Sequence, residues 1–155
     1  MTTDFASSDP SPTYNPWNFE HTPGGSSSGS SVAVASRTVG AALGSQTGGS
    51  TCRPAAYNGI VGLKATYGRI SRYGVVPVSW SLDHVGILVR TVEDAALMLQ
   101  VMAGEDPNDP GSASEPVPDF MKQMSEHNRP PRIGTVSQYY QETSTPEVWA
   151  HTQDV

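Results

Sequence analysis

Two short runs of glycine and serine constrain this chain more than any other feature: "GGSSSGSS" at residues 24–31 and "TGGS" at residues 47–50. A flexible linker would continue into more glycine and serine. Here the runs bracket a segment of small apolar residues, and the second run stops at Arg-Pro-Ala-Ala, residues 53–56. Glycine lets the backbone turn so that successive N–H groups converge. The runs therefore predict two ordered loops rather than a linker.

Composition excludes several classes of function. Nine Lys and Arg against fifteen Asp and Glu give a net charge of −6, so we expect neither nucleic acid nor a membrane as a partner. The single cysteine, Cys52, excludes an internal disulfide. The histidines lack metal-ligand spacing, and we expect no metal and no cofactor; they are His21, His84, His127 and His151. With no signal peptide and no apolar run long enough to span a bilayer, a cytoplasmic location is expected.

The order of apolar segments favours an α/β arrangement. We expect a helix in "SVAVASRTV", a buried strand in "VGAALGS", a strand in "IVGLKAT", and short strands and turns over residues 68–90. The clearest helix follows, with Thr91 as N-cap, acidic residues in its first turn and Gly104 as C-cap. A surface loop at residues 105–120, a strand in "RPPRIGTV" and a helix in "TPEVWAHTQDV" complete the prediction.

The second loop has the form of a site for acyl transfer. A serine nucleophile needs a base, and the developing oxyanion needs N–H donors, which glycines directly before the serine can supply. Taken alone, Gly-Gly-Ser is more often a turn. Residues 21–64, "HTPGGSSSGSSVAVASRTVGAALGSQTGGSTCRPAAYNGIVGLK", closely resemble the signature region of the amidase signature family, the serine hydrolases with a Ser-Ser-Lys triad. The resemblance extends outward on both sides.

The resemblance implies a fold and a set of site residues. The family fold is one large α/β domain with a mixed β-sheet flanked by α-helices, and residues 1–155 would form a partial domain without a separate second domain. Ser50 matches the nucleophile, and Ser26 matches the bridging serine held by a cis peptide bond. The backbone N–H groups of Thr47, Gly48, Gly49 and Ser50 match the family's oxyanion hole. Gly24, Gly25 and Arg53 are expected to support the two loops.

Three departures from the family pattern stand out. The family's catalytic lysine lies upstream in a VKDN-type motif that this chain does not contain, and neither Lys64 nor Lys122 matches it. Ser28 replaces a glycine that is usual in the family. Gln46 stands where one family member, the glutaminase-type subunit of a tRNA-dependent amidotransferase, usually has Asp. We therefore expect a central fragment of the domain, lacking the segment with the catalytic lysine and the C-terminal part. Its exposed strand edges would favour self-association or pairing with complementary segments.

The implied function is hydrolysis of a carboxylic amide, with a small-molecule amide as substrate. Ser50 would attack the carbonyl while Ser26 relays the proton between a neutral lysine and the leaving amine. One alternative is a non-catalytic remnant of an amidase. Another is the glutaminase-type subunit of a tRNA-dependent amidotransferase, which requires a partner subunit.

Other residues carry weaker hypotheses. Cys52 could act as a nucleophile with His84 and Asp83, but inert packing is the simpler interpretation. Asp83, in "SLDHVG", is interpreted as structural. Arg53 could bind a substrate carboxylate instead of supporting its loop. An aromatic group could line a cleft or, more simply, anchor the proline-rich segment around it; its members are Tyr14, Trp17 and Phe19.

Overall fold

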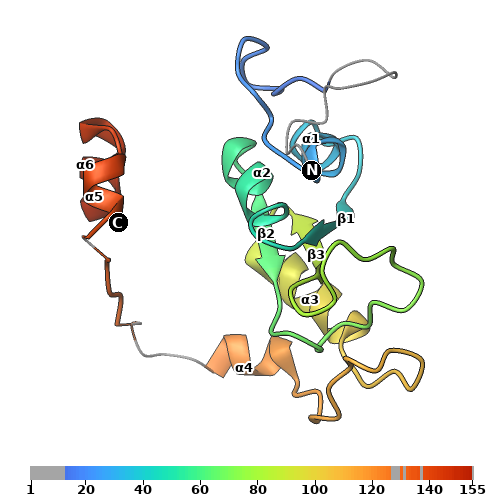
Figure 1. Ribbon diagram of the computed structural model, residues 1–155. Coiled ribbons are helices and arrows are strands. Elements are labelled where there is room, and N and C mark those ends of the chain that lie inside the picture. Colours follow the sequence, from blue (N-terminus) through green and yellow to red (C-terminus); the bar gives the residue numbers. More distant parts are fainter. Residues whose placement is uncertain (1–12, 127–129, 131, 137, 155) are drawn as a thin grey trace.

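The computed structural model describes residues 13–126, 130, 132–136 and 138–154. Within them, the first hundred residues contain both strands and helices, with the second and third strands consecutive, and only helices follow (Figure 1). The elements in chain order are α1 (Ser28–Ala35), β1 (Ala41–Gln46), α2 (Cys52–Tyr57), β2 (Val61–Lys64), β3 (His84–Val89), α3 (Val92–Met102), α4 (Phe120–Glu126), α5 (Tyr140–Thr143) and α6 (Pro146–Asp154). The α/β class is confirmed.

The three strands form one sheet in the order β1-β3-β2, with β3 in the centre. Both neighbours run antiparallel to β3, and the β1–β3 register extends from Ala41 opposite Val89 to Gln46 opposite His84. The predicted strand at β1 exists, but the expectation that it is buried is wrong. It is an edge strand on which exposed and half-buried residues alternate. Only β3, flanked on both sides, is buried along most of its length.

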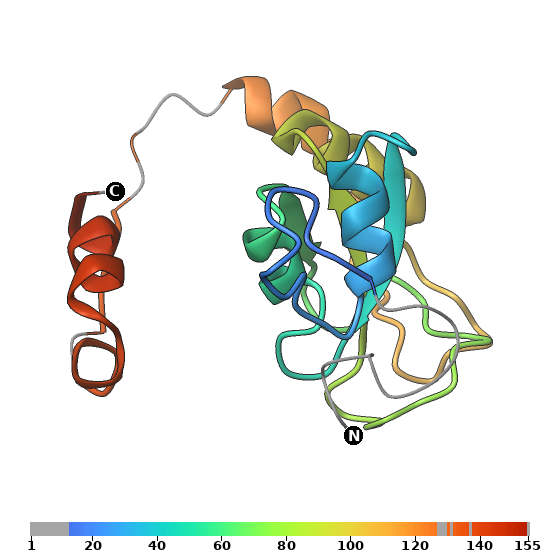
Figure 2. The same ribbon diagram turned by 90° about the horizontal axis from the view of Figure 1, so that it is seen from above.

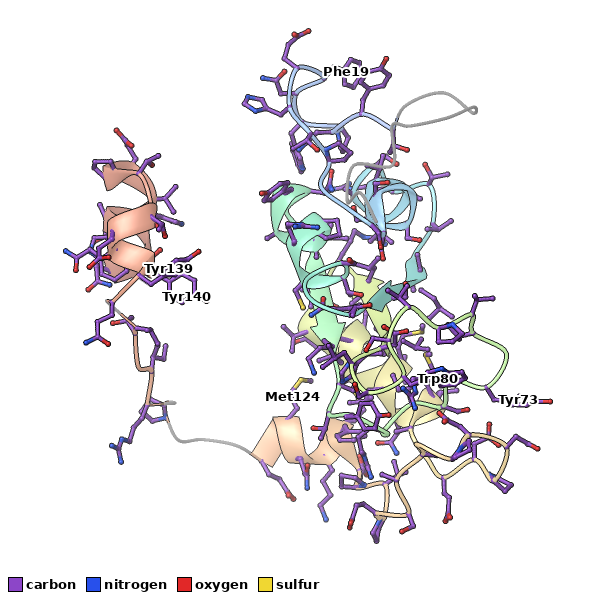
Figure 3. All side chains as sticks on the ribbon, in the orientation of Figure 1. Phe19, Tyr73, Trp80, Met124, Tyr139 and Tyr140 are labelled. Atoms are coloured by element: carbon purple, nitrogen blue, oxygen red, sulfur yellow. The ribbon has the colours of Figure 1, made fainter. Side chains whose placement is uncertain are left out.

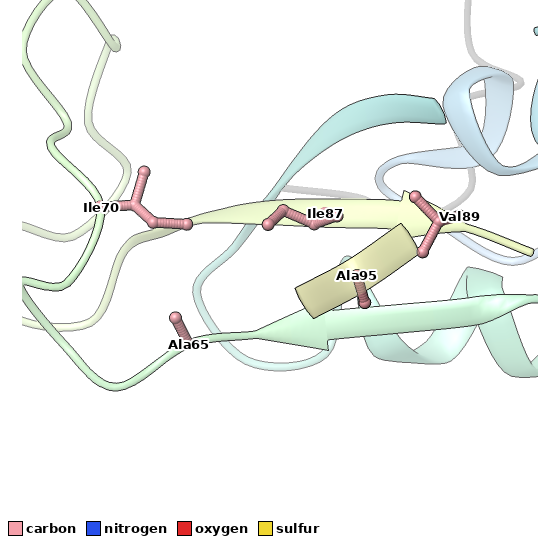
Figure 4. Close-up of a cluster of buried hydrophobic side chains, with 5 residues drawn as sticks. All are labelled: Ala65, Ile70, Ile87, Val89 and Ala95. Atoms are coloured by element: carbon pink, nitrogen blue, oxygen red, sulfur yellow. The ribbon is translucent and has the colours of Figure 1, made fainter. Parts of the chain in front are cut away.

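Alternate residues of β3 supply two cores, because successive side chains of a strand point to opposite faces of the sheet. Ile87 and Val89 pack with Ala95 of α3 and with residues that follow β2 (Figure 4). Leu88 points the other way and packs against Val34 of α1 and against α2. The sheet therefore lies between α3 on one face and the helices next to the two glycine-serine loops on the other.

Helix α3 begins as the sequence predicts. The Thr91 hydroxyl accepts a hydrogen bond from the N–H of Asp94 at 3.1 Å, which satisfies one free donor of the first turn. The end of the helix differs from the prediction: Ala103, not Gly104, is the C-cap. Ala103 is extended and forms an isolated bridge with Ile70, so a tertiary contact sets the end of α3.

Other segments differ from the prediction. Helix α2 was not predicted, although its proline, Pro54, lies in the first turn, where proline is tolerated. Helix α4 was missed as well; the Asp119 carboxylate accepts from the N–H of Lys122 at 2.9 Å and marks its start. Of the predicted strands in 68–90, only β3 forms a strand of the sheet. The predicted strand in "RPPRIGTV" is absent over residues 132–136, while residues 129 and 131 lie outside the described part.

The C-terminal prediction is confirmed for α6, which follows Thr145 and starts at Pro146. Figure 1 and Figure 2 both place α5 and α6 apart from the sheet and its helices. Among the described residues, no helix combines the length and the apolar character that crossing a bilayer requires.

Candidate active site

The first glycine-serine loop leads into α1, and the peptide bond between Gly25 and Ser26 is cis. Gly24 before it has φ +71°, and a Cβ at this position would lie 3.0 Å from the ring of Tyr57 and 3.1 Å from Pro54 Cα. Both its conformation and the space around it therefore require glycine. Ser28, the departure from the family pattern, is accommodated as the buried first residue of α1.

The second loop follows β1 and leads into α2, and it lies against the first. The backbone N–H of Ser27 donates to the carbonyl oxygen of Ser50 at 3.1 Å. The Ser27 hydroxyl also accepts from the N–H of Ser45 at 3.2 Å. The fold thus brings together the two loops that carry Ser26 and Ser50, and both serines are partly exposed.

Arg53, in the first turn of α2, reaches back to the first loop. Its Nε and Nη2 donate to the carbonyl oxygen of Gly25 at 3.2 and 2.6 Å. The guanidinium therefore holds the peptide group that precedes Ser26. Arg53 thus has a hydrogen-bond partner within the chain, as expected for a residue that supports the loop.

Two hydrogen bonds fix the orientation of the peptide groups in the second loop. The carbonyl of Gly48 accepts from Gln46 Nε2 at 3.4 Å, and the carbonyl of Gly49 accepts from the N–H of Arg53 at 2.8 Å. In a trans peptide the C=O and N–H groups point in opposite directions. The N–H groups of Gly49 and Ser50 therefore point away from Gln46 and α2.

The buried side chain of Gln46 also holds the start of α2. Its Oε1 accepts from the N–H of Thr51 at 2.9 Å and from the N–H of Cys52 at 3.0 Å. A carboxylate can only accept, whereas an amide can also donate, as Gln46 does to the carbonyl of Gly48. The Gln46 side chain therefore links the start of α2 to the second loop.

Asp83 is the partner of Thr47 at the other end of the loop. The Thr47 hydroxyl donates to Asp83 Oδ1 at 2.5 Å, and Asp83 Oδ2 accepts from the N–H groups of Val78 and Ser79 at 2.7 and 2.9 Å. Burial of this carboxylate raises its pKa, but the hydrogen bonds from Thr47, Ser79 and Val78 and the charge of Arg72 outweigh it. The net effect holds the pKa of Asp83 below its ordinary value.

A cavity of about 210 Å³ opens beside Asp83. Two of its residues, Arg72 and Asp109, form a largely buried ion pair at 3.4 Å, and Arg72 Nη1 also donates to the carbonyl of Trp80 at 2.6 Å. The other side chains are mainly apolar, and Figure 3 shows Tyr73 and Trp80 on the same irregular segment. The cavity therefore combines an apolar lining with charges that are already paired.

Asn58 joins the elements behind the loops. It is fully buried, and its Nδ2 lies within hydrogen-bond distance of the carbonyls of Pro23 and Pro54 and of the Ser31 hydroxyl, at 2.7–2.8 Å. Trp17 Nε1 donates to the Asn58 carbonyl at 2.8 Å, so this ring anchors the proline-rich segment. No sequence pattern singled out Asn58. The only local signal was the Asn-Gly pair that ends α2.

The two lysines have other partners. Lys64 Nζ donates to the carbonyl of Ala65 at 2.9 Å and lies 3.3 Å from His84 Nε2. Lys122 Nζ lies 3.8 Å from the carboxylate of Glu126 on exposed α4. Neither contact directs a lysine toward Ser26.

The alternative nucleophile is not assembled. Cys52 is exposed, and its Sγ lies 3.8 Å from the carbonyl of Gly62. His84 Nδ1 lies 2.6 Å from the carbonyl of Leu82, and Asp83 is engaged by Thr47. The expectation that Cys52 packs in a core is also wrong. Within the described residues, no three His, Cys, Asp or Glu side chains gather as a metal would require.

Proteins of known name match most of the chain. It is 52% identical over 137 residues to a glutamyl-tRNA(Gln) amidotransferase subunit of Geobacter metallireducens, covering 88% of this chain and 28% of that protein. The crystal structure of the Thermotoga maritima subunit of the same name matches with 48% identity and a TM-score of 0.66, covering 68% of this chain and 24% of that one. The structure of native peptide amidase from Stenotrophomonas maltophilia matches with 41% identity and a TM-score of 0.67, and the match covers 73% of this chain and 24% of the amidase.

The chain thus spans about a quarter of the length of these relatives. The sequence pattern of the amidase family matches residues 1–155, and the chain belongs to that family.

Proposed function

We propose that Ser50 is the nucleophile of an amide hydrolysis and that Ser26 is its proton relay. The observation that carries this proposal is the hydrogen bond from the Ser27 N–H to the Ser50 carbonyl, which brings the two serine loops together. The two hydrogen bonds from Arg53 to the Gly25 carbonyl support the proposal, since they fix the backbone next to Ser26. Membership of the amidase family supports the class of reaction.

The reaction proceeds in two halves. Ser50 Oγ attacks the carbonyl carbon of the amide while its proton passes through Ser26 to a base. The N–H groups of residues 47–50 stabilise the oxyanion, and the orientation of the Gly48 and Gly49 carbonyls supports this role for the N–H groups of Gly49 and Ser50. The proton then moves through Ser26 to the leaving amine, and water hydrolyses the acyl-enzyme.

The base is not assigned to Lys64 or Lys122, because their partners lie elsewhere. The proposal requires a lysine from another segment or polypeptide for full turnover. The remnant hypothesis differs here, since it predicts that Ser50 has no enhanced reactivity even when such a lysine is supplied.

A second candidate is release of ammonia from glutamine by one component of an amidotransferase. It is favoured by the 52% identity to a protein named as a glutamyl-tRNA(Gln) amidotransferase subunit. Gln46 counts against it, because that subunit usually has Asp at this position. This candidate predicts glutamine-dependent ammonia release only in the presence of a partner subunit.

The test is covalent labelling with a fluorophosphonate of the purified chain, alone and mixed with a polypeptide segment that carries the VKDN-type lysine motif, read by intact mass and peptide mapping. We expect one adduct on Ser50, loss of the adduct in Ser50→Ala, and its retention in Ser36→Ala, a matched control at an exposed serine. Hydrolysis of small neutral amides and of glutamine, with and without a partner subunit, then separates the two candidates. A chain that neither labels nor hydrolyses any of these overturns catalysis by this chain and leaves its family unchanged.

A further inference from the structure

The β1–β3 ladder ends at the point where the second loop begins. Its last backbone pair is Gln46 opposite His84, so Thr47 and Asp83 are the next two residues facing each other. There the Thr47 hydroxyl donates to Asp83 Oδ1 at 2.5 Å. A side-chain bond thus continues the link between the two chain segments where β1 leaves the sheet.

Asp83 is itself firmly placed. Its other oxygen accepts from the N–H groups of Val78 and Ser79, and its own N–H donates to the Ser79 carbonyl at 3.0 Å. The residue is 8% exposed, and an ionised carboxylate is a stronger acceptor than a neutral group. It can therefore hold Thr47 in a fixed position relative to β3.

From this juxtaposition we infer that Asp83 is a positioning residue: acting through the Thr47 hydroxyl, it fixes the backbone N–H groups of residues 47–50. The inference rests on the proposed function for the role of those N–H groups in catalysis. The structural part of the inference, that Asp83 beside β3 orders the loop, does not depend on whether the chain is active. From the sequence alone, Asp83 was interpreted as structural or, in the alternative nucleophile, as a partner of Cys52, and the Thr47 side chain had no assigned role.

The discriminating variant is Thr47→Val. It removes the hydroxyl and leaves in place the hydrogen bonds that Asp83 Oδ2 accepts from the N–H groups of Val78 and Ser79. Thr47→Ser keeps the hydroxyl. Thr38→Val, at an exposed position remote from the loop, is the matched control. Amide hydrogen exchange of the purified chain is followed in peptides that cover residues 51–53, whose N–H groups donate to Gln46 Oε1 and to the carbonyl of Gly49, and, separately, in peptides of α3.

We expect Thr47→Val to accelerate exchange at the N–H groups of residues 51–53 by about tenfold while exchange in α3 stays unchanged, as for loss of one local hydrogen bond to a charged group. Thr47→Ser should restore protection to within about threefold of the parent, and Thr38→Val should not affect the loop. Unchanged exchange at residues 51–53 overturns the inference. Equal acceleration in the loop and α3 also overturns it, because the contact would then serve the whole fold.

Fluorophosphonate labelling of Ser50 separates this inference from the proposed function. Slower labelling of Thr47→Val together with loop-specific exchange supports both. If the parent chain does not label and the loop-specific exchange effect is present, the proposed function fails for this chain and the positioning of the loop by Asp83 stands.

Discussion

The guanidinium of Arg53 donates two hydrogen bonds to the carbonyl oxygen of Gly25, 28 residues earlier in the sequence. The helix that follows the second loop therefore holds the backbone of the first. Because one acceptor oxygen receives two donors from a planar group, the contact depends on the fork geometry of arginine.

Replacement of Arg53 by Gln or Lys should lower the free energy of unfolding by about 1–3 kcal/mol, as expected for loss of charge-assisted hydrogen bonds. Labelling of Ser50 should slow in the same variants. Denaturant unfolding and labelling rates check this, with Arg90→Lys, which changes an exposed arginine, as control. If Arg53 instead binds substrate, only amides that carry a carboxylate would be affected, and stability would not change.

Gly86→Ala should destabilise the fold by about 1–3 kcal/mol through overpacking. A Cβ at Gly86 would collide with the side chain of Thr51, which is fully buried. Gly29→Ala is the contrasting change, because Gly29 lies in α1 and, apart from its chain neighbours and the backbone of its own helix, no atom lies within 4 Å of its added Cβ; it should stabilise by about 0.5–1 kcal/mol. Urea unfolding midpoints measure both. Equal effects at the two glycines would contradict the packing described at Thr51.

Asn58→Ala should cost about 1–3 kcal/mol, because it leaves buried acceptors without their donor. The affected groups are the carbonyls of Pro23 and Pro54 and the Ser31 hydroxyl. Asn108→Ala removes an exposed amide whose one partner among the described residues is Asp106, and it should leave the unfolding midpoint nearly unchanged. A loss of stability at Asn108 as large as at Asn58 would refute the role given to the buried amide.

The free energy of unfolding should fall as the solution becomes acidic. At Asp83, burial raises the pKa, but hydrogen bonds from Thr47, Ser79 and Val78 outweigh this effect. At Asp109, burial likewise raises the pKa, and hydrogen bonds from Arg72 and Gly111 outweigh it. The net pKa of each is lowered from 3.8. A carboxyl with a lower pKa in the folded state binds protons more readily when unfolded. Its contribution is therefore present above pH 3.8 and is lost as the pH falls through the folded-state pKa.

Urea midpoints measured from about pH 7 to about pH 2 test this, and Asp109→Asn should show a shallower acid-side decline than the parent. A decline of the same steepness in Asp109→Asn would count against the buried ion pair with Arg72 as its source.

The sequence allowed part of this structure to be predicted. Helix α3 was predictable because its cap and first turn carry local signals at Thr91 and Asp94. Helix α2 was not predicted, because its 6 residues are too few to show a helical pattern, and the C-terminus of α3 was misplaced because a bridge to Ile70 fixes Ala103. The family and the two loops followed from their residue pattern, and family membership is confirmed.

The supporting contacts of the site left no such signal. Asp83 meets Thr47 across 36 residues, and Asn58 meets Pro23 across 35. Hydrogen bonds of this kind depend on the register of β1 against β3 and on how α1 and α2 pack. A pattern of neighbouring residues cannot reveal them.

The network around Asn58 has a consequence for which part of the chain holds the two serine loops together. Its partners outside α2 lie 27 to 41 residues away along the chain, and the entropic cost of closing a loop rises by only about 0.6 kcal/mol for each doubling of its length. The contacts of this network therefore lie within residues 17–58, a stretch that also contains both serines. The approach of the Ser26 and Ser50 loops is thus held by contacts made inside one continuous stretch of chain.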